Sequence, residues 1–210
     1  MTTGVLPPLQ AIVDVDVALR AGWQPVALAQ AFLDGGARFL QIRAKRLGSG
    51  ALLDLADAIV TRARAYDAAV IVNDRVDVAR LSGAAGAHVG QDDLPPSAAR
   101  AQLGSGAIVG YSTHSVEQVG AADREPVTYI AVGPIFGTRT KDTGYDAVGL
   151  ELVAAARRAT ERPIVAIGGV TLENAASVVA AGASCVAVIS DLLTGDAPAD
   201  RARAFLRALQ

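Results

Sequence analysis

Short apolar runs alternate with amphipathic helical stretches along the whole chain. The runs are rich in valine, isoleucine and alanine, a composition typical of strands that are buried on both faces of a parallel sheet. We therefore predict strands at residues 9–15, 39–43, 69–72, 86–89, 108–111, 129–132, 164–167 and 186–189.

Helices are predicted between these strands, at residues 25–33, 50–66, 76–82, 97–103, 115–122, 150–160, 172–181 and 200–209. Ser115 followed by Gln118 forms a capping-box pattern, and Thr171 is the expected cap of the helix at 172–181. Glycines at 35–36 and at 182 stand where helices should end.

Eight strand–helix units in 210 residues leave about 26 residues for each unit, which is short but sufficient for a (β/α)8 TIM barrel. An open doubly wound sheet is the alternative, although such sheets usually have only about five or six strands. The chain has no linker-like or low-complexity segment. We predict an α/β fold, with residues 1–210 forming one TIM-barrel domain.

The composition of the chain excludes several classes of protein. Hydrophobic residues make up 51% and charged residues 19% of the chain, which indicates a globular protein. The formal charge of −2 gives no general attraction to nucleic acid or to anionic membranes. No apolar run approaches the ~20 residues that span a bilayer, the first residues lack a secretory signal, and Cys185 is the only cysteine. We expect a cytoplasmic protein.

Polar side chains gather at the end of the second predicted strand. Gln41, Arg43 and Lys45 share one face of the strand, because side chains alternate, and Ile42 takes the other. The polar face should point into the barrel mouth, where two unpaired cations would be costly to bury. A bound phosphate resolves this conflict. The alternative is an internal ion pair with Asp74 or Asp93.

The next two strands end in carboxylates. Asn73 and Asp74 follow the third strand, and Asp93 follows the fourth. Carboxylates on neighbouring strand ends can bind one Mg²⁺, with water and a substrate phosphate completing its coordination. Asp92 has the simpler interpretation of a solvated loop residue before Pro95-Pro96.

The later strand ends are rich in glycine and hydroxyl groups. Ser112 and its neighbours could donate to an anion or only satisfy loop backbone. The loop at 133–148 is predicted to be a lid over a charged ligand, or alternatively a disordered connection. Gly168-Gly169 and the segment at 188–191 follow the seventh and eighth strands. Those two positions commonly form a phosphate site in TIM barrels.

Four other residues are candidates mainly for structure. His88 and His114 lack metal-ligand spacing. His88 is predicted to be a hydrogen-bonded core residue, and His114 to have either an acid–base or a structural role. Cys185 is predicted to be a small core residue, and Trp23, after the first strand, to be a packing residue.

Two anion sites at one barrel mouth suggest two phosphorylated small-molecule substrates and a transfer between them, with diphosphate as the leaving group. No residue stands out as a general base, and none is needed if the nucleophile is an aromatic nitrogen without a proton. The enzyme would then position the substrates and neutralise the departing diphosphate.

The chain resembles the thiamine phosphate synthase (thiamine-phosphate pyrophosphorylase) family. The matching segments keep the family order between about residues 39 and 191: 41–45 (QIRAK), 72–79 (VNDRVDVA), 86–94 (GAHVGQDDL), 112–115 (STHS), 132–141 (VGPIFGTRTK), 166–169 (AIGG) and 188–190 (VIS).

This resemblance implies a transferase that joins 4-amino-5-hydroxymethyl-2-methylpyrimidine diphosphate to 4-methyl-5-(2-phosphooxyethyl)thiazole by a dissociative, Mg²⁺-assisted mechanism. It implies three groups of site residues. The residues that would hold the pyrimidine diphosphate are Gln41, Arg43, Lys45, Asn73, Ser112 and Lys141, and all of these except Gln41 would also be catalytic. Mg²⁺ would be bound by Asp74 and Asp93. The thiazole phosphate would be held by Thr138, Thr140, Gly169, Ile189 and Ser190.

The chain departs from the family in its first strand, usually L-Y-x-I-T-D, where Gln10 and Val13 replace the aromatic residue and the threonine. This departure concerns the closure of the pyrimidine side of the pocket. Two alternatives remain: a thiazole tautomerase on the same barrel, which would use His114, and a non-catalytic thiazole-phosphate-binding regulator. The sequence is compatible with a homo-oligomer.

Overall fold

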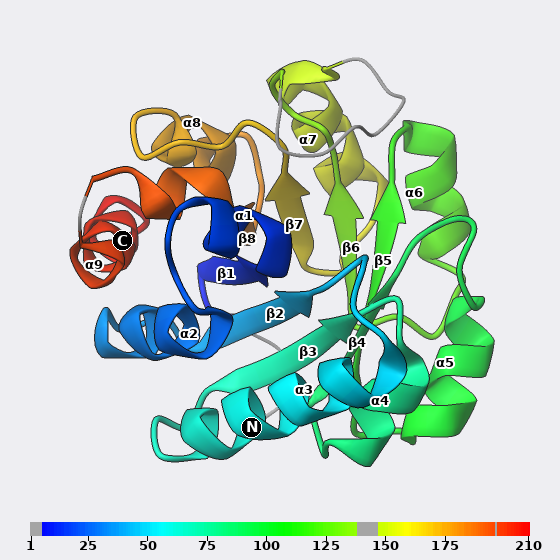
Figure 1. Ribbon diagram of the computed structural model, residues 1–210. Helices are drawn as coiled ribbons and strands as arrows, with labels where there is room; N and C mark the ends of the chain where they lie inside the picture. Colours follow the sequence, from blue (N-terminus) through cyan, green and yellow to red (C-terminus); the bar gives the residue numbers. More distant parts are fainter. Residues whose placement is uncertain (1–5, 138–146, 196) are drawn as a thin grey trace.

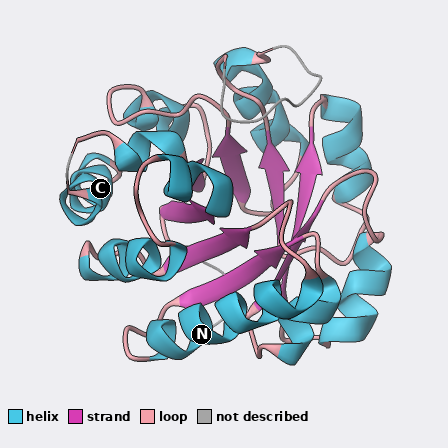
Figure 2. Cartoon of the chain, in the orientation of Figure 1, coloured by secondary structure: helices cyan, strands magenta, loops and turns pink. Residues whose placement is uncertain are grey.

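The fold is a closed barrel of eight parallel strands surrounded by helices (Figures 1 and 2). A computed structural model describes residues 6–137, 147–195 and 197–210. Neighbouring strands pair in sequence order, and β1 closes the barrel against β8. The strands are β1 Leu9–Asp14, β2 Phe39–Arg43, β3 Ala69–Asn73, β4 Gly86–Val89, β5 Ile108–Thr113, β6 Tyr129–Val132, β7 Ile164–Ile167 and β8 Cys185–Val188.

The helices cover the outside of the barrel. They are α1 Val15–Arg20, α2 Pro25–Asp34, α3 Ser49–Arg64, α4 Val76–Leu81, α5 Pro96–Leu103, α6 Val116–Ala122, α7 Gly149–Ala159, α8 Ala175–Ala180, the 3-10 helix η1 Ser190–Leu193 and α9 Pro198–Ala208. The predicted TIM barrel is confirmed, with every predicted strand at its expected place. No helix in the described part of the chain is long and apolar enough to cross a membrane.

Of the two predicted helix caps, one is confirmed by the structure and one is not. Ser115 caps α6, its hydroxyl accepting a hydrogen bond from the Gln118 N–H at 3.3 Å, as predicted. Thr171 does not cap α8, so that prediction is wrong. The helix begins at Ala175, because the Asn174 side chain accepts from the Thr171 N–H and donates to the Gly169 carbonyl, which holds 171–174 in a separate turn.

Two short helices were not predicted. In α1, the Asp14 carboxylate accepts a hydrogen bond from the Val17 N–H at 3.0 Å and so caps a helix of only six residues. Like η1, this helix is too short to show a helical period in the sequence.

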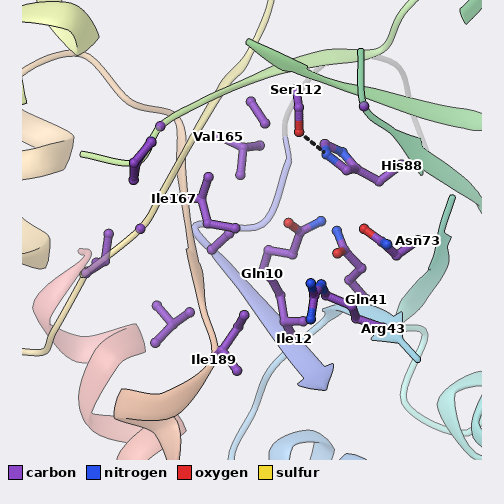
Figure 3. Close-up of a pocket in the computed structure, with 18 of the residues that line it drawn as sticks. Gln10, Ile12, Gln41, Arg43, Asn73, His88, Ser112, Val165, Ile167 and Ile189 are labelled. Atoms are coloured by element: carbon purple, nitrogen blue, oxygen red, sulfur yellow. Dashed lines mark hydrogen bonds between the residues drawn. The ribbon is translucent and has the colours of Figure 1, made fainter. Parts of the chain in front are cut away.

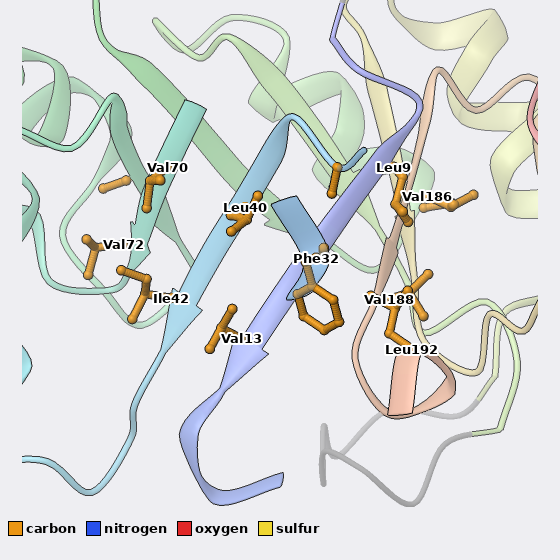
Figure 4. Close-up of a cluster of buried hydrophobic side chains, with 14 of the residues drawn as sticks. Leu9, Val13, Phe32, Leu40, Ile42, Val70, Val72, Val186, Val188 and Leu192 are labelled. Atoms are coloured by element: carbon orange, nitrogen blue, oxygen red, sulfur yellow. The ribbon is translucent and has the colours of Figure 1, made fainter. Parts of the chain in front are cut away.

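Alternation along the strands separates two apolar cores. Outward-facing residues such as Leu40, Ile42 and Val70 pack against the helices, as Figure 4 shows. Inward-facing residues such as Phe39 and Tyr129 fill the barrel interior, with their rings edge to face at 6.0 Å. Buried Cys185 belongs to the inner core and partly buried Trp23 packs against the outer one, as predicted. The inner core closes one end of the barrel and leaves the carboxyl end of the strands open to a pocket.

Candidate functional site

A cavity of about 600 Å³ opens at the carboxyl ends of the strands, and all eight strands contribute to its lining. The structure brings together the predicted site residues that it describes. These are Gln41, Arg43, Lys45, Asn73, Asp74, Asp93, Ser112, Gly169, Ile189 and Ser190. The remaining predicted residues, Thr138, Thr140 and Lys141, lie outside the described residues, as does most of the predicted lid.

The two cations at the end of β2, Arg43 and Lys45, are already paired. Lys45 Nζ lies 2.5 Å from Asp74 Oδ2, in agreement with the ion-pair alternative considered from the sequence. Arg43 instead forms an ion pair with Asp14, which is almost fully buried at 3% exposure. The sequence reasoning missed Asp14, although the β1–β2 register places it directly beside Arg43. An incoming anion would therefore compete with these carboxylates for the two cations.

Asp74 and Asp93 both line the cavity, and Asp74 is close enough to influence the pKa of Asp93, which supports their predicted convergence. Burial, together with the neighbouring Asp74, raises the pKa of Asp93, and a hydrogen bond from the Gly90 N–H at 2.8 Å partly opposes this rise. The two like charges are therefore unfavourable together unless a cation lies near them. Lys45 supplies one such charge.

The backbone at Asp74 helps to aim its carboxylate. Asp74 has a left-handed conformation with φ of 62°, which aspartate tolerates better than most residues. Its N–H donates to the His88 carbonyl at 2.7 Å, so the turn after β3 is tied to β4.

Asp74 and Asp93 are carboxylates at the mouth that could hold a metal ion. Among the described residues, no group of three or more histidine, cysteine, aspartate and glutamate side chains could hold a metal. Two carboxylates at the edge of an open cavity suit an ion that keeps several waters and binds substrate phosphate. Asp92, beside them, is exposed, as the solvated-loop interpretation predicts.

A hydrogen-bonded chain crosses the floor of the cavity. His88 Nε2 lies 2.8 Å from Ser112 Oγ (Figure 3). Its Nδ1 lies 2.9 Å from the hydroxyl of Tyr129. Tyr129 in turn accepts a hydrogen bond from Gln10 Nε2 at 3.3 Å. The prediction of a hydrogen-bonded core histidine is confirmed, whereas the sequence reasoning gave Tyr129 no role. The sequence feature that could have pointed to Tyr129 is Gly110, its partner on β5, because a Cβ at Gly110 would lie 2.1 Å from the tyrosine ring.

Gln10 and Val13, the two residues of β1 that differ from the family pattern, lie on opposite faces of the strand. Gln10 lines the cavity, but Val13 belongs to the outer core beneath the helices. Only Gln10 can affect the pocket directly. His114 lines the cavity as well, and its Nδ1 donates to the Gly133 carbonyl at 2.5 Å, which fixes the ring against the loop after β6.

The opposite half of the mouth is built from tightly packed backbone. Gly168 and Gly169 have φ values of 100° and 63°, which favour glycine. A Cβ at Gly169 would lie 2.7 Å from the Gly137 carbonyl oxygen, so no larger residue fits without movement. The Phe136 N–H donates to the Gly168 carbonyl at 3.0 Å, which joins the loops after β6 and β7.

Asp191 joins the loops after β7 and β8. Its Oδ2 accepts from the Leu172 N–H at 3.0 Å and from Arg201 Nη2 at 2.7 Å. Arg201 belongs to α9 and also donates through Nε to the Asp191 carbonyl. The guanidinium therefore neutralises a carboxylate beside the segment predicted to hold a phosphate, and fixes that segment in place.

Comparison with known proteins agrees with this geometry. The family described as "Thiamine monophosphate synthase" matches residues 10–192. The thiamine-phosphate synthase of Koribacter versatilis is 43% identical over 215 aligned positions, covering 100% of this chain and 99% of the relative. That of Chlorobium luteolum is 38% identical, covering 95% and 92%. The solved thiamine phosphate pyrophosphorylase from Pyrococcus furiosus superposes with a TM-score of 0.88 at 27% identity, covering 97% and 95%.

Proposed function

Because this chain belongs to the thiamine monophosphate synthase family of transferases in thiamine biosynthesis, we propose that it joins 4-amino-5-hydroxymethyl-2-methylpyrimidine diphosphate to 4-methyl-5-(2-phosphooxyethyl)thiazole. The products are thiamine phosphate and diphosphate. The observation that carries the proposal is the gathering of Arg43, Lys45, Asp74 and Asp93 on one side of a single cavity.

The diphosphate would lie on the charged side of the mouth. Arg43 and Lys45 provide positive charge there, and Asn73 and Ser112 provide neutral donors. A diphosphate bound to Lys45 would replace Asp74 in its ion pair, and Asp74 could then hold Mg²⁺ together with Asp93. The ion would neutralise the charge that develops on the leaving diphosphate.

The reaction itself needs no proton transfer. The bond between the pyrimidine methylene carbon and the diphosphate oxygen breaks, and the electron pair leaves with the oxygen. The thiazole nitrogen then donates its lone pair to that carbon. A dissociative path passes through a methylene cation, which the aminopyrimidine ring stabilises. The apolar side chains of Ile12, Val165 and Ile167 line the cavity and would keep water away from this cation.

The thiazole phosphate would lie on the opposite side. Gly169, Ile189 and Ser190 line the cavity there, and the glycine lets the backbone approach an anion closely. Thr138, Thr140 and Lys141 complete this proposed set and stay predictions. The two reacting groups would then face each other across the barrel axis.

An assay of product formation tests the proposal. Both substrates are mixed with the protein and Mg²⁺, and thiamine phosphate is oxidised and measured as thiochrome fluorescence. We expect a signal that disappears with EDTA and falls steeply for Asp74→Ala and Lys141→Ala. A signal that chelation leaves unchanged would contradict the metal assignment, and no signal under any condition would contradict the transferase.

The same samples test the two alternatives. A thiazole tautomerase would isomerise the thiazole precursor and lose that activity in His114→Ala, and a non-catalytic regulator would bind the thiazole phosphate without converting it. A His114→Ala variant that keeps most of its synthase activity counts against the tautomerase. The paired carboxylates count against both, because neither activity involves a diphosphate.

A further inference from the structure

The floor of the cavity contains a buried carboxamide that uses only part of its hydrogen-bonding capacity within the described part of the chain. Gln10 projects inward from β1 and is only 1% exposed. A buried amide loses its hydrogen bonds to water, and an apolar side chain of similar length would fill the same space without that cost. This cost suggests that the amide is present for a ligand.

One end of the carboxamide is already fixed. Gln10 Nε2 donates to the Tyr129 hydroxyl at 3.3 Å, and this hydroxyl lies 2.9 Å from His88 Nδ1. Because Nε2 can only donate, the tyrosine oxygen accepts from it, and the hydroxyl, which carries one proton, also forms a hydrogen bond with His88 Nδ1. Burial raises the pKa of Tyr129, so the hydroxyl keeps this proton over the physiological range. The chain holds the amide in one orientation.

The other end of the carboxamide has unused capacity. Within the described part of the chain, no group donates a hydrogen bond to Gln10 Oε1, and the residue lines the cavity. Figure 3 shows the carboxamides of Gln10, Gln41 and Asn73 extending into the same space, with Val165 and Ile167 forming an apolar wall. Polar edges around an apolar wall suit a flat heteroaromatic ring.

We propose that Gln10 is a specificity-determining residue, whose Oε1 accepts a hydrogen bond from the exocyclic amino group of the pyrimidine substrate. This inference rests on the proposed function. Oε1 can only accept, and the pyrimidine diphosphate carries one neutral N–H donor, its amino group. Tyr129 acts through Gln10 as a positioning residue, because its hydroxyl sets which end of the amide faces the ring.

A double-mutant cycle between protein and ligand tests the contact. The ligands are the monophosphate esters of the pyrimidine with and without the amino group, whose poorer leaving group keeps them intact. Calorimetry gives the ratio of their affinities for the wild type, Gln10→Met and Tyr129→Phe. We expect the preference for the amino ester to fall by about threefold to tenfold in Gln10→Met, the range for one neutral hydrogen bond.

Controls separate this contact from packing. Ile12→Val changes the same strand and the same cavity without a polar atom, so it should weaken both esters equally and leave their ratio unchanged. Tyr129→Phe keeps Gln10 but releases its anchor, and should reduce the ratio by less than Gln10→Met does. If Gln10→Met weakens both esters equally, or leaves both unchanged, Gln10 does not recognise the amino group.

The two proposals fail differently. Thiamine phosphate formation by the wild type, combined with an unchanged affinity ratio in Gln10→Met, would refute the role of Gln10 alone. A wild type that forms no product but prefers the amino ester, with that preference lost in Gln10→Met, would refute the transferase and keep the contact. A wild type that forms no product and binds neither ester would refute both.

Discussion

The two halves of the barrel mouth are built by opposite means. Over β1–β4 the lining carries charged side chains, paired as Arg43 with Asp14 and Lys45 with Asp74. Over β6–β8 it consists of apolar side chains and of loop backbone packed closely at Gly168 and Gly169. A ligand on the charged half must exchange ion-pair partners, whereas a ligand on the glycine half can be bound with little rearrangement.

This difference explains how one barrel can hold two anions and treat them differently. The diphosphate departs during the proposed reaction, and charges that have protein partners to return to can release it. The thiazole phosphate stays attached to the product throughout, and a fixed backbone cradle only has to position it. Substitutions should therefore affect catalysis on the first half and affinity on the second.

Removing both carboxylates of the charged half should have the largest effect. We expect Asp74→Asn combined with Asp93→Asn to lower kcat/KM by about a thousandfold, because a metal contributes several kcal/mol to stabilising the transition state. Steady-state thiochrome assays at increasing Mg²⁺ measure this. Asp92→Asn, in the same loop but exposed, should stay within about twofold of the wild type. Equal losses in both proteins would contradict the assignment.

Breaking the buried ion pair should have the next largest effect. We expect Arg43→Met to lower the free energy of unfolding by about 2–3 kcal/mol, because it leaves the buried Asp14 carboxylate without its cation. Urea denaturation measures this change. Adding Asp14→Asn removes the stranded charge, so the double variant should be more stable than Arg43→Met alone. Simple additivity of the two losses would show that the pair is not coupled.

The glycine half can be tested with two glycines of the same backbone conformation. Gly169 and Gly83 both have φ of 63°, but a Cβ at Gly83 would meet only the end of the flexible Arg64 side chain, at 3.5 Å. We expect Gly83→Ala to cost about 1 kcal/mol of unfolding free energy from backbone strain alone. Gly169→Ala should cost about 1 kcal/mol more through its contacts with Gly137 and Phe136.

Substrate affinity completes this test. Gly169→Ala should raise the KM for the thiazole phosphate and leave the KM for the pyrimidine diphosphate unchanged, whereas Gly83→Ala should change neither. A rise in both KM values would mean that the two halves of the mouth do not act separately.

The smallest expected effect is a dependence of stability on pH. The pKa of Asp93 is raised in the folded protein, mainly by burial, so its contribution to stability is complete below the unfolded pKa and is lost as pH rises through the folded pKa. In metal-free buffer, the wild type should therefore gain stability relative to Asp93→Asn as the pH is lowered from 7 to about 4. Denaturation midpoints at several pH values measure this, and a constant difference would contradict it.

The sequence predicted the barrel because its signals are local. Each strand is a short apolar run, and the alternation at 41–45 was enough to place Gln41, Arg43 and Lys45 together in the mouth. What the sequence did not reveal depends on pairing between strands. The partner of Arg43 is set by the β1–β2 register, and the space for Tyr129 is set by a glycine on the neighbouring strand.

The orientation of Gln10 also could not be predicted from the sequence. From the sequence it was only a departure from the family pattern, and its alternation with Val13 could not say which of the two faced the pocket. The structure places one in the cavity and the other under the helices. Thr171 was misread because a competing side chain, Asn174, organises the turn before the helix.

The contact between Arg201 and Asp191 has a practical consequence for handling the protein. The last helix of the chain supports the rim of the pocket through this guanidinium, although it packs against α2 at the periphery (Figure 1). Trimming the chain before α9, or attaching an affinity tag that disturbs it, would loosen the loops after β7 and β8 from a distance.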